Sequence, residues 1–190
     1  MDTMLDIWGS FVIGGMVLVA VITLNIGMSE SGGRMTQELM VQENTIELVR
    51  RLEYDLYKIR YGVPSDTGIV AADSASIRFL ADIDGDGDVD NVWYYVGSPD
   101  ELSSTPNPDD RPLYRIVNGQ TVNASSDGIV AFRFRYSNAL GNATAVVDSI
   151  RAIKVSLDVE SPYPYTDVDS STYSGAHWET DIVPRNIQGD

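Results

Sequence analysis

Residues 7–26 read IWGSFVIGGMVLVAVITLNI, a run of twenty residues without a charged side chain. As a helix, such a run measures about 30 Å, which is the thickness of the hydrocarbon core of a bilayer. A cleaved signal peptide is the alternative. Against it, the residues before the run are acidic, the run is long for a signal sequence, and no A-x-A cleavage site follows. We therefore expect residues 1–28 to form an uncleaved transmembrane helix.

The apolar pattern continues beyond this run with a helical period. Between residues 29 and 62, charged side chains fill most positions around an apolar stripe, which is typical of an amphipathic helix. The stripe consists of Met35, Leu39, Ile46, Val49, Leu52, Leu56 and Ile59. It lasts less than four heptads, so packing on the following domain is favoured over a coiled coil. Gly62, followed by Val63 and Pro64, is a typical helix stop.

After Pro64 the period changes from about 3.6 to two. Ile77, Phe79 and Ala81 point to one side and Arg78 to the other, and alternation of this kind recurs in residues 129–137 and 150–160. This pattern is typical of antiparallel strands with one buried and one wet face. We therefore expect residues 63–190 to form an antiparallel β-sheet domain covered by the amphipathic helix, which gives an α+β fold.

The composition excludes several classes of function. The chain has 13 Lys and Arg against 28 Asp and Glu, a net charge of −15, which argues against nucleic-acid binding and against docking on anionic lipid head groups. No nucleophile elbow, phosphate loop or zinc spacing occurs in the sequence, so we expect no enzyme activity and no small-molecule substrate. The single histidine, His177, is predicted to be a surface or packing residue in a polar tail, and residues 161–178 are predicted to form a loop packed on the sheet.

Residues 82–90 read DIDGDGDVD, with a carboxylate at every second position. The first half follows the calcium-loop pattern D-x-D-x-D-G, but Trp93 stands where an EF-hand has its Glu and no flanking helix fits, which excludes an EF-hand. The candidate ligands for a structural Ca²⁺ are Asp82, Asp84, Asp86, Asp88 and Asp90. An acidic turn in a hairpin of strands 76–82 and 90–96 is the alternative.

The order of these pieces, with a membrane helix running into an amphipathic helix and then a meandering sheet, resembles the type IV pilin-like superfamily. Within it the chain looks most like the minor pilins and the J-type pseudopilin of type II secretion. The stretches that carry the resemblance are ELVRRLEYDLYKIRYG (47–62), IRFLADIDGDGDVDNVWYYV (77–96), LYRIVNG (113–119), GIVAFRFRYSNALG (128–141), IRAIKVSLDVE (150–160) and VPRNI (183–187).

The resemblance implies a structural, membrane-anchored subunit. Such a subunit assembles through its N-terminal helix, with other copies or other pilin-like subunits, into a filament, a filament tip or an envelope complex. It also implies an extracytoplasmic sheet domain, in the periplasm or at the cell surface. The weak charge bias of Asp2 and Asp6 before the membrane run and Arg34 after it points the other way, and we follow the resemblance.

The start of the chain departs from the family pattern. Prepilins carry a basic leader that ends in Gly, followed by Phe and a nearby Glu, whereas here only Asp6 offers a carboxylate near the start. We expect either that a leader lies outside this numbering or that the chain is a divergent member inserted without that cleavage. Asp6 is the candidate partner of a neighbouring subunit's N-terminal amine, with interfacial solvation as the alternative. Gly9, Gly14 and Gly15 would let neighbouring helices approach closely.

A second hypothesis makes the helix a mere anchor. The chain would then be a membrane-tethered binding or adhesion module with a calcium-stabilised sheet domain. Its binding site would lie in the turn-rich stretch 97–112 or in the tyrosine-rich stretch 161–173.

Overall fold

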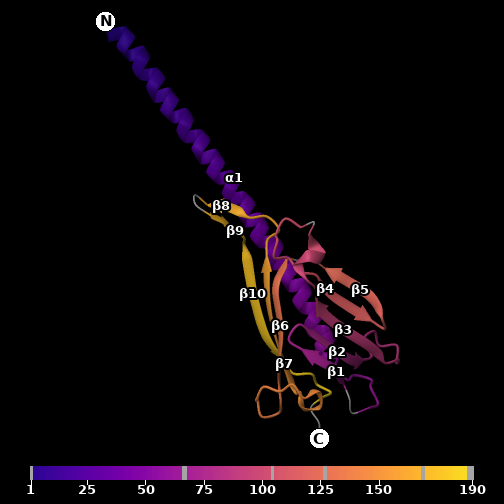
Figure 1. Cartoon of the computed structure of the whole chain (residues 1–190). Coiled ribbons are helices and arrows are strands. Elements are labelled where there is room, and N and C mark those ends of the chain that lie inside the picture. The colour runs from indigo at the N-terminus through magenta and orange to yellow at the C-terminus, as the bar shows by residue number, and fades with distance from the viewer. Residues whose placement is uncertain (1, 66–67, 104, 126–127, 168–169, 188–190) are drawn as a thin grey trace. The chain divides into compact units, whose positions relative to one another are not determined.

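The computed structural model describes residues 2–65, 68–103, 105–125, 128–167 and 170–187. The α-helix α1 spans Asp2–Tyr57, and the rest of the described chain is built mainly of strands (Figure 1). The strands are β1 (Ile69–Asp73), β2 (Ser76–Ala81), β3 (Asp90–Val96), β4 (Leu113–Val117), β5 (Gln120–Ser125), β6 (Ile129–Ser137), β7 (Ala152–Glu160), β8 (Tyr165–Asp167), β9 (Ser170–Thr172) and β10 (Gly175–Ile182). Two short 3-10 helices span Pro99–Leu102 and Val147–Ser149. The chain divides into two compact units, Met1–Leu39 and Met40–Asp190.

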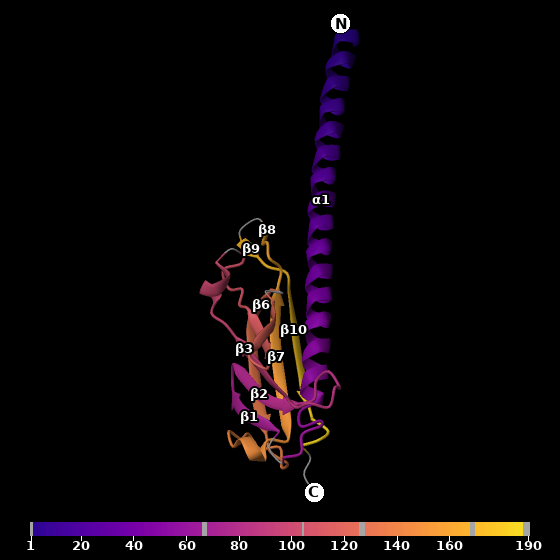
Figure 2. The ribbon, with the colours of Figure 1, turned by 90° about the vertical axis from the view of Figure 1, so that its right-hand side faces the viewer.

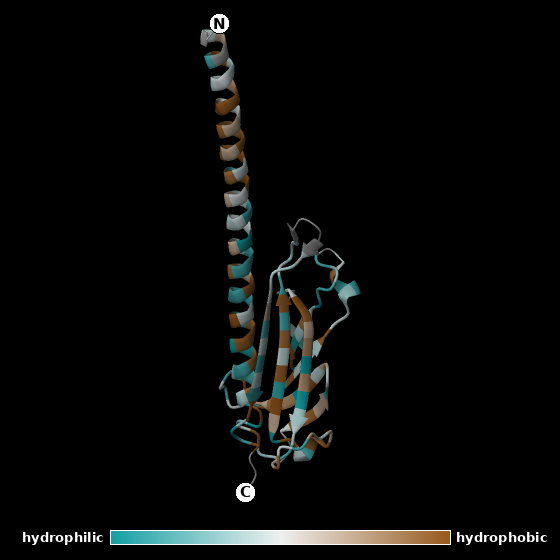
Figure 3. Ribbon diagram, turned by 90° about the vertical axis from the view of Figure 1, so that its left-hand side faces the viewer, coloured by the Kyte–Doolittle hydropathy of each residue, from teal (hydrophilic) through white to brown (hydrophobic). Residues whose placement is uncertain are grey.

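The first unit is the N-terminal part of α1. This part is long and apolar enough to cross a membrane, as judged by length and composition, and Figure 3 shows hydrophobic residues along it in brown. No residue of its most apolar stretch is buried. Trp8 and Phe11 are 72% and 78% exposed. The hydroxyls of Ser10 and Thr23 donate to the carbonyls of Asp6 and Val19, at 2.8 and 2.9 Å. These bonds satisfy the polar groups inside an apolar helix without a second chain.

In the second unit, the end of α1 packs on the strands with only part of the expected stripe: Val49, Leu52, Leu56 and Ile59 are buried, as predicted. The buried helix residues are Val41, Thr45, Leu48, Val49, Leu52, Asp55 and Leu56. At about 100° per residue these lie within an arc of about 120°. The expectation was therefore wrong for Met35, Leu39 and Ile46, which are all at least half exposed.

Two polar residues inside the buried arc explain the error. Thr45 is buried because its hydroxyl donates to the Val41 carbonyl at 2.6 Å, one turn earlier. Asp55 is buried because Tyr94 and Arg115 bind its carboxylate. A pattern based on apolar residues alone omits both positions and includes Ile46, which lies about 160° from Leu48 around the helix.

The described strands form two main antiparallel sheets and a two-stranded ribbon (Figures 1 and 2). The first sheet has the order β1-β2-β3-β4-β5, the second has the order β10-β7-β6, and β8 pairs with β9. The sequence predicted a single sheet, because alternation reports which face of a strand is buried and not which strands pair. The α+β fold with a long N-terminal helix is confirmed.

Alternating side chains of both sheets and the end of α1 enclose one hydrophobic core. The first sheet contributes Ile77, Phe79, Val92 and Tyr94, and the second contributes Phe134, Ile153, Val155, Leu157 and Ile182. Figure 3 shows the alternation as bands of brown and teal along the strands. Each fully buried aliphatic side chain of this kind contributes about 1.5–3 kcal/mol.

The segment 161–178 is only partly the loop that the sequence predicted. From Gly175 to Ile182 the chain forms β10, which pairs along its whole length with β7. His177 and Trp178 are therefore strand residues, and the prediction of a polar tail was wrong. The alternation AHWETDI was hidden because its outward positions are polar and Trp178 is the only large apolar residue before Ile182.

Candidate functional site

The acidic segment 82–90 is the loop of the predicted hairpin, which β2 and β3 form; their pairing ends with Ala81 opposite Asp90. Asp82 is buried at the start of the loop, whereas Asp84 and Asp86 are exposed. One carboxylate oxygen from each of these three residues lies within 4.8 Å of the others. The hairpin therefore brings together three of the five predicted ligands.

The loop backbone orients these three carboxylates. The amides of Gly85 and Gly87 donate to the two oxygens of Asp82, at 2.6 and 3.2 Å. The amide of Asp86 donates to Asp84 at 3.2 Å. Gly85 and Gly87 have φ values of +83° and +94°, which lets the chain curl at little steric cost. Carboxylate oxygens have further lone pairs, so this donor set fits a hard cation such as Ca²⁺.

Asp88 and Asp90 do not belong to the three-carboxylate group. Asp90 is buried and accepts hydrogen bonds from the amide of Ile83 at 3.0 Å and from the Asn118 side chain at 2.6 Å. These bonds close the base of the loop. Asp88 is exposed, and its amide donates to Asp86 at 2.8 Å. A cation held here would therefore need backbone carbonyls or water to complete six to eight oxygens.

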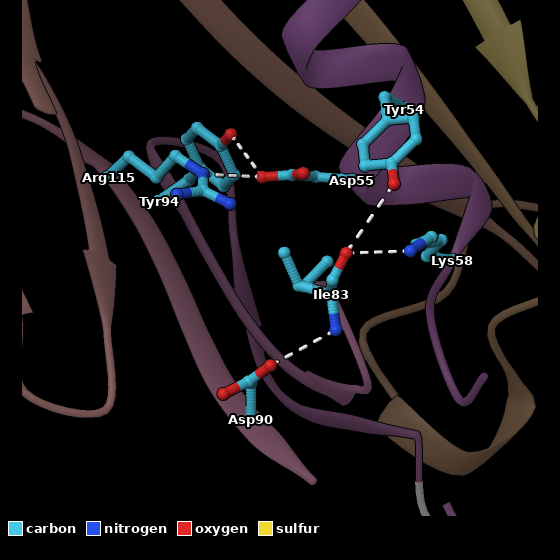
Figure 4. A network of polar contacts seen from close by, with 7 residues as sticks. All are labelled: Tyr54, Asp55, Lys58, Ile83, Asp90, Tyr94 and Arg115. Carbon is cyan, nitrogen blue, oxygen red and sulfur yellow. Dashed lines mark hydrogen bonds and ion pairs between the residues drawn. The ribbon is translucent and has the colours of Figure 1, made fainter. Parts of the chain in front are cut away.

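The end of α1 holds the loop from the other side (Figure 4). Lys58 Nζ donates to the Ile83 carbonyl at 2.6 Å, and the Tyr54 hydroxyl points at the same oxygen from 3.5 Å. A hydrogen bond with Tyr54 raises the pKa of Lys58, and the nearby Asp82 charge adds to the effect. The ammonium group therefore stays charged and partly offsets the five carboxylates of the loop.

A buried polar network joins α1 to the first sheet (Figure 4). The Asp55 carboxylate accepts hydrogen bonds from the Tyr94 hydroxyl and from Arg115 Nε, both at 2.6 Å. Burial raises the pKa of Tyr94, and the Asp55 charge adds to the shift, so the phenol stays protonated as a donor. Reasoning from the sequence missed this network. Its signal is a carboxylate between Leu52 and Ile59, inside the buried arc of the helix.

A second buried carboxyl group, Asp110, lies in the segment before β4. Among the described residues its Oδ1 has no hydrogen-bond partner, and only 2% of the residue is exposed. Burial raises the pKa of the Asp110 carboxyl; a hydrogen bond from Thr105 opposes the shift, and the charges of Glu160 and Asp109 add to it. The neighbouring Asn107 is buried and donates to Glu160 at 3.0 Å.

The predicted assembly residues lie in the first unit. Asp6 is exposed, and a Cβ added to Gly9, Gly14 or Gly15 would meet nothing within 4 Å in this chain. At about 100° per residue, Gly9 lies about 140° from Gly14, so the three glycines do not share a face. Gly14 instead shares a face with Ser10, one turn earlier, which makes a small-xxx-small pair that the sequence reading missed.

His177 is not part of either polar cluster. Its Nδ1 lies 2.5 Å from Asp158 on the neighbouring strand, and both side chains are exposed. This is an ordinary cross-strand pair of a polar face. Comparison of the chain with family models, with curated proteins and with solved structures gave no match.

Proposed function

We propose that the chain is a structural, membrane-anchored subunit of the pilin-like kind. It assembles through the N-terminal part of α1, with other copies or with other pilin-like subunits, into a filament, a filament tip or an envelope complex. The observation that carries this proposal is the apolar run of residues 7–26, which has a hydropathy suited to a membrane and contains no buried residue. Such a surface needs lipid or other helices to cover it.

The face formed by Ser10 and Gly14 supports assembly rather than anchoring alone. In lipid, helices associate through close packing and not through a hydrophobic drive, and small residues one turn apart allow that packing. Asp6 lies on the same side of the helix, one turn before Ser10. A carboxylate there is costly in lipid unless a neighbour's cation, such as a terminal amine, approaches it.

We place the sheet domain on the extracytoplasmic side of the membrane. The chain carries a net charge of −15, and most of its charged residues follow the membrane run. A strongly acidic domain is repelled by the anionic cytoplasmic leaflet.

Cysteine cross-linking in native membranes tests the assembly. The chain has no cysteine, so Gly14→Cys introduces a single reactive thiol. We expect rapid oxidative cross-linking of Gly14→Cys to a second copy, or to a partner subunit that carries a matching cysteine. Met16→Cys is the matched control, because it lies at the same depth but about 160° away around the helix. Equal or absent cross-linking of both variants argues against a packed Ser10–Gly14 face.

The second candidate function is a membrane-tethered binding module whose sheet domain is stabilised by Ca²⁺. The observation that favours it is the group formed by Asp82, Asp84 and Asp86. Purification of the native particle separates the two functions, because assembly gives a multi-chain particle and tethering gives a monomer in detergent.

Thermal melts with millimolar Ca²⁺ or with chelator test the metal. At a hundredfold excess over Kd, binding stabilises the folded state by about 2.7 kcal/mol. We expect the wild type to melt several degrees higher with Ca²⁺ and the double variant Asp84→Asn/Asp86→Asn to show no shift. Magnesium should substitute poorly, since it requires a tighter octahedral site. If the wild type does not shift, the loop is an acidic turn.

A further inference from the structure

A surface pocket of about 480 Å³ lies in the second unit, between the end of α1 and the C-terminal segment. Its walls come from two stretches that are more than a hundred residues apart in the sequence. The lining residues are Tyr54, Tyr57, Lys58, Tyr61, Arg185 and Asn186. No Asp or Glu is among them, although the chain as a whole has 28 acidic residues.

Three of the six residues that line the pocket are tyrosines. Tyr54, Tyr57 and Tyr61 follow one another at spacings of three and four and are 55%, 42% and 49% exposed. Their rings present large and rigid contact surfaces, because each side chain has only two rotatable bonds. Such aromatic groups are enriched at the centres of protein interfaces.

The two cations of the pocket have different tasks. Lys58 Nζ is bound to the Ile83 carbonyl and lies 4.8 Å from the ring centre of Tyr54 and 5.5 Å from that of Tyr61. It is therefore already committed to the acidic loop and to the rings. Arg185 is exposed and makes no ion pair or hydrogen bond with the described residues. Its guanidinium group is the free anion receptor of the pocket.

The backbone next to Arg185 is held in place. Arg60 Nη1 donates to the Asn186 carbonyl at 3.0 Å, and the Asn186 side chain donates to the Ile59 carbonyl at 3.4 Å. Ile187 is buried in the core. The backbone at Arg185 is therefore held beside the tyrosines before a ligand arrives, which lowers the entropic cost of binding.

We propose that this pocket binds a segment of a partner protein that presents a single carboxylate flanked by apolar or aromatic side chains. The guanidinium group of Arg185 pairs with the carboxylate in a bidentate manner, and the tyrosine rings cover the apolar neighbours. The net charge of −15 repels nucleic acids and sulfated polysaccharides, which carry many charges over a long distance. A single carboxylate meets less of this repulsion, because salt screens charges beyond about 8–10 Å.

A peptide array probed with the full chain in detergent micelles tests this site. The array holds hexapeptides whose third position is Asp, Glu, Asn or Gln and whose other positions are sampled from apolar and aromatic residues. We expect the peptides with Asp or Glu to bind at least about tenfold more tightly than their amide counterparts. Arg185→Gln should remove that preference. Arg133→Gln, at an exposed arginine of β6 that does not line the pocket, should retain it.

A second variant separates the ring contacts from the charge. Tyr57→Ala, a change at a half-exposed position, should weaken the carboxylate and the amide peptides to a similar degree. The proposal is overturned if no peptide binds above background, if acid and amide peptides bind equally, or if Arg185→Gln binds like the wild type. It is also overturned if inorganic phosphate or heparin competes more strongly than the best peptide, since the site would then select a polyanion or phosphate.

Discussion

Asp55 is the acceptor that ties α1 to two strands of the first sheet. Its carboxylate is buried and accepts hydrogen bonds from Tyr94 and from Arg115, so both of these donors depend on Asp55. A buried ion pair of this kind stabilises less than its short distances suggest, because desolvation offsets the attraction. Removing one partner, however, leaves an uncompensated buried charge.

We therefore expect Asp55→Ala to lower the free energy of unfolding by about 3–5 kcal/mol. Tyr94→Phe, which removes one hydrogen bond to a charged group, should cost about 1.5–3 kcal/mol. Both values can be measured by denaturant unfolding of the full chain in detergent. Glu47→Gln is the control, because it breaks the surface ion pair with Arg51 and should cost at most about 1 kcal/mol. Similar losses for Asp55→Ala and Glu47→Gln would contradict the role of the network.

The Asp110 carboxyl group should make the stability of the sheet domain pH-dependent. Burial raises its pKa in the folded chain above the value of about 3.9 in an unfolded chain. The stability that the protonated group contributes is therefore fully present below the unfolded pKa and is lost as the pH rises through the folded pKa.

Asp110→Asn should remove this pH-dependent loss of stability, so the variant should melt at a higher temperature than the wild type at pH 7. In acid, the melting temperatures of the two proteins should approach each other. Melts between pH 3 and pH 8 measure the difference. Asp148→Asn is the control, because Asp148 is exposed and does not contribute to the Asp110 shift; it should change the profile little. A wild type that gains stability over Asp110→Asn as the pH rises would mean that the carboxylate has a partner in solution.

At the scale of elements, α1 carries apolar residues on two sides, and only one side is buried. Leu52 is fully buried, and Ile46 is 51% exposed. The two have similar hydropathy and volume, so the sequence does not distinguish them. The difference follows from which side of α1 faces the sheets. Thr45 and Asp55 are buried on the same side as Leu52.

Matched alanine substitutions test which side of α1 is buried. Leu52→Ala should cost about 2–5 kcal/mol in unfolding free energy, because it leaves a cavity in the core. Ile46→Ala should stay within about 0.5 kcal/mol in the isolated chain, as surface substitutions usually do. Denaturant unfolding of both variants under the same conditions measures the two losses of unfolding free energy. Comparable losses would mean that Ile46 is buried, as the sequence pattern predicted.

At the scale of the whole molecule, we expect the second unit to be soluble once the membrane-length run of the first unit is removed. Deletion of residues 1–28 removes the membrane-length run and leaves the buried arc of α1 from Val41 onward intact. We expect a soluble monomer with an unchanged β-sheet signal in circular dichroism, measured by size-exclusion chromatography and light scattering. That fragment should not enter the native assembly. Its recovery there at wild-type levels would show that the second unit assembles by itself.

Local sequence patterns were sufficient for the helix, for the hairpin around the acidic loop and for the inward side chains of β2, β6 and β7. Periods of 3.6 and two report which side of an element is apolar, and an uncharged run of twenty residues reports a membrane-length helix. Five aspartates at alternate positions also marked the candidate metal loop, since ligands that are close in sequence stay close in space.

Only the tertiary structure decided which strands pair, which helix residues are buried and which distant groups meet. Asp55 needs Tyr94 and Arg115, which lie 39 and 60 residues further along the chain, and Tyr54 meets Arg185 in one pocket. The spacing of the sequence assigned Asp90 to the metal group, but in the folded hairpin its carboxylate accepts hydrogen bonds from Ile83 and Asn118 instead. These choices depend on the free energy of packing and of satisfying buried polar groups over the whole domain, and no local period encodes that sum.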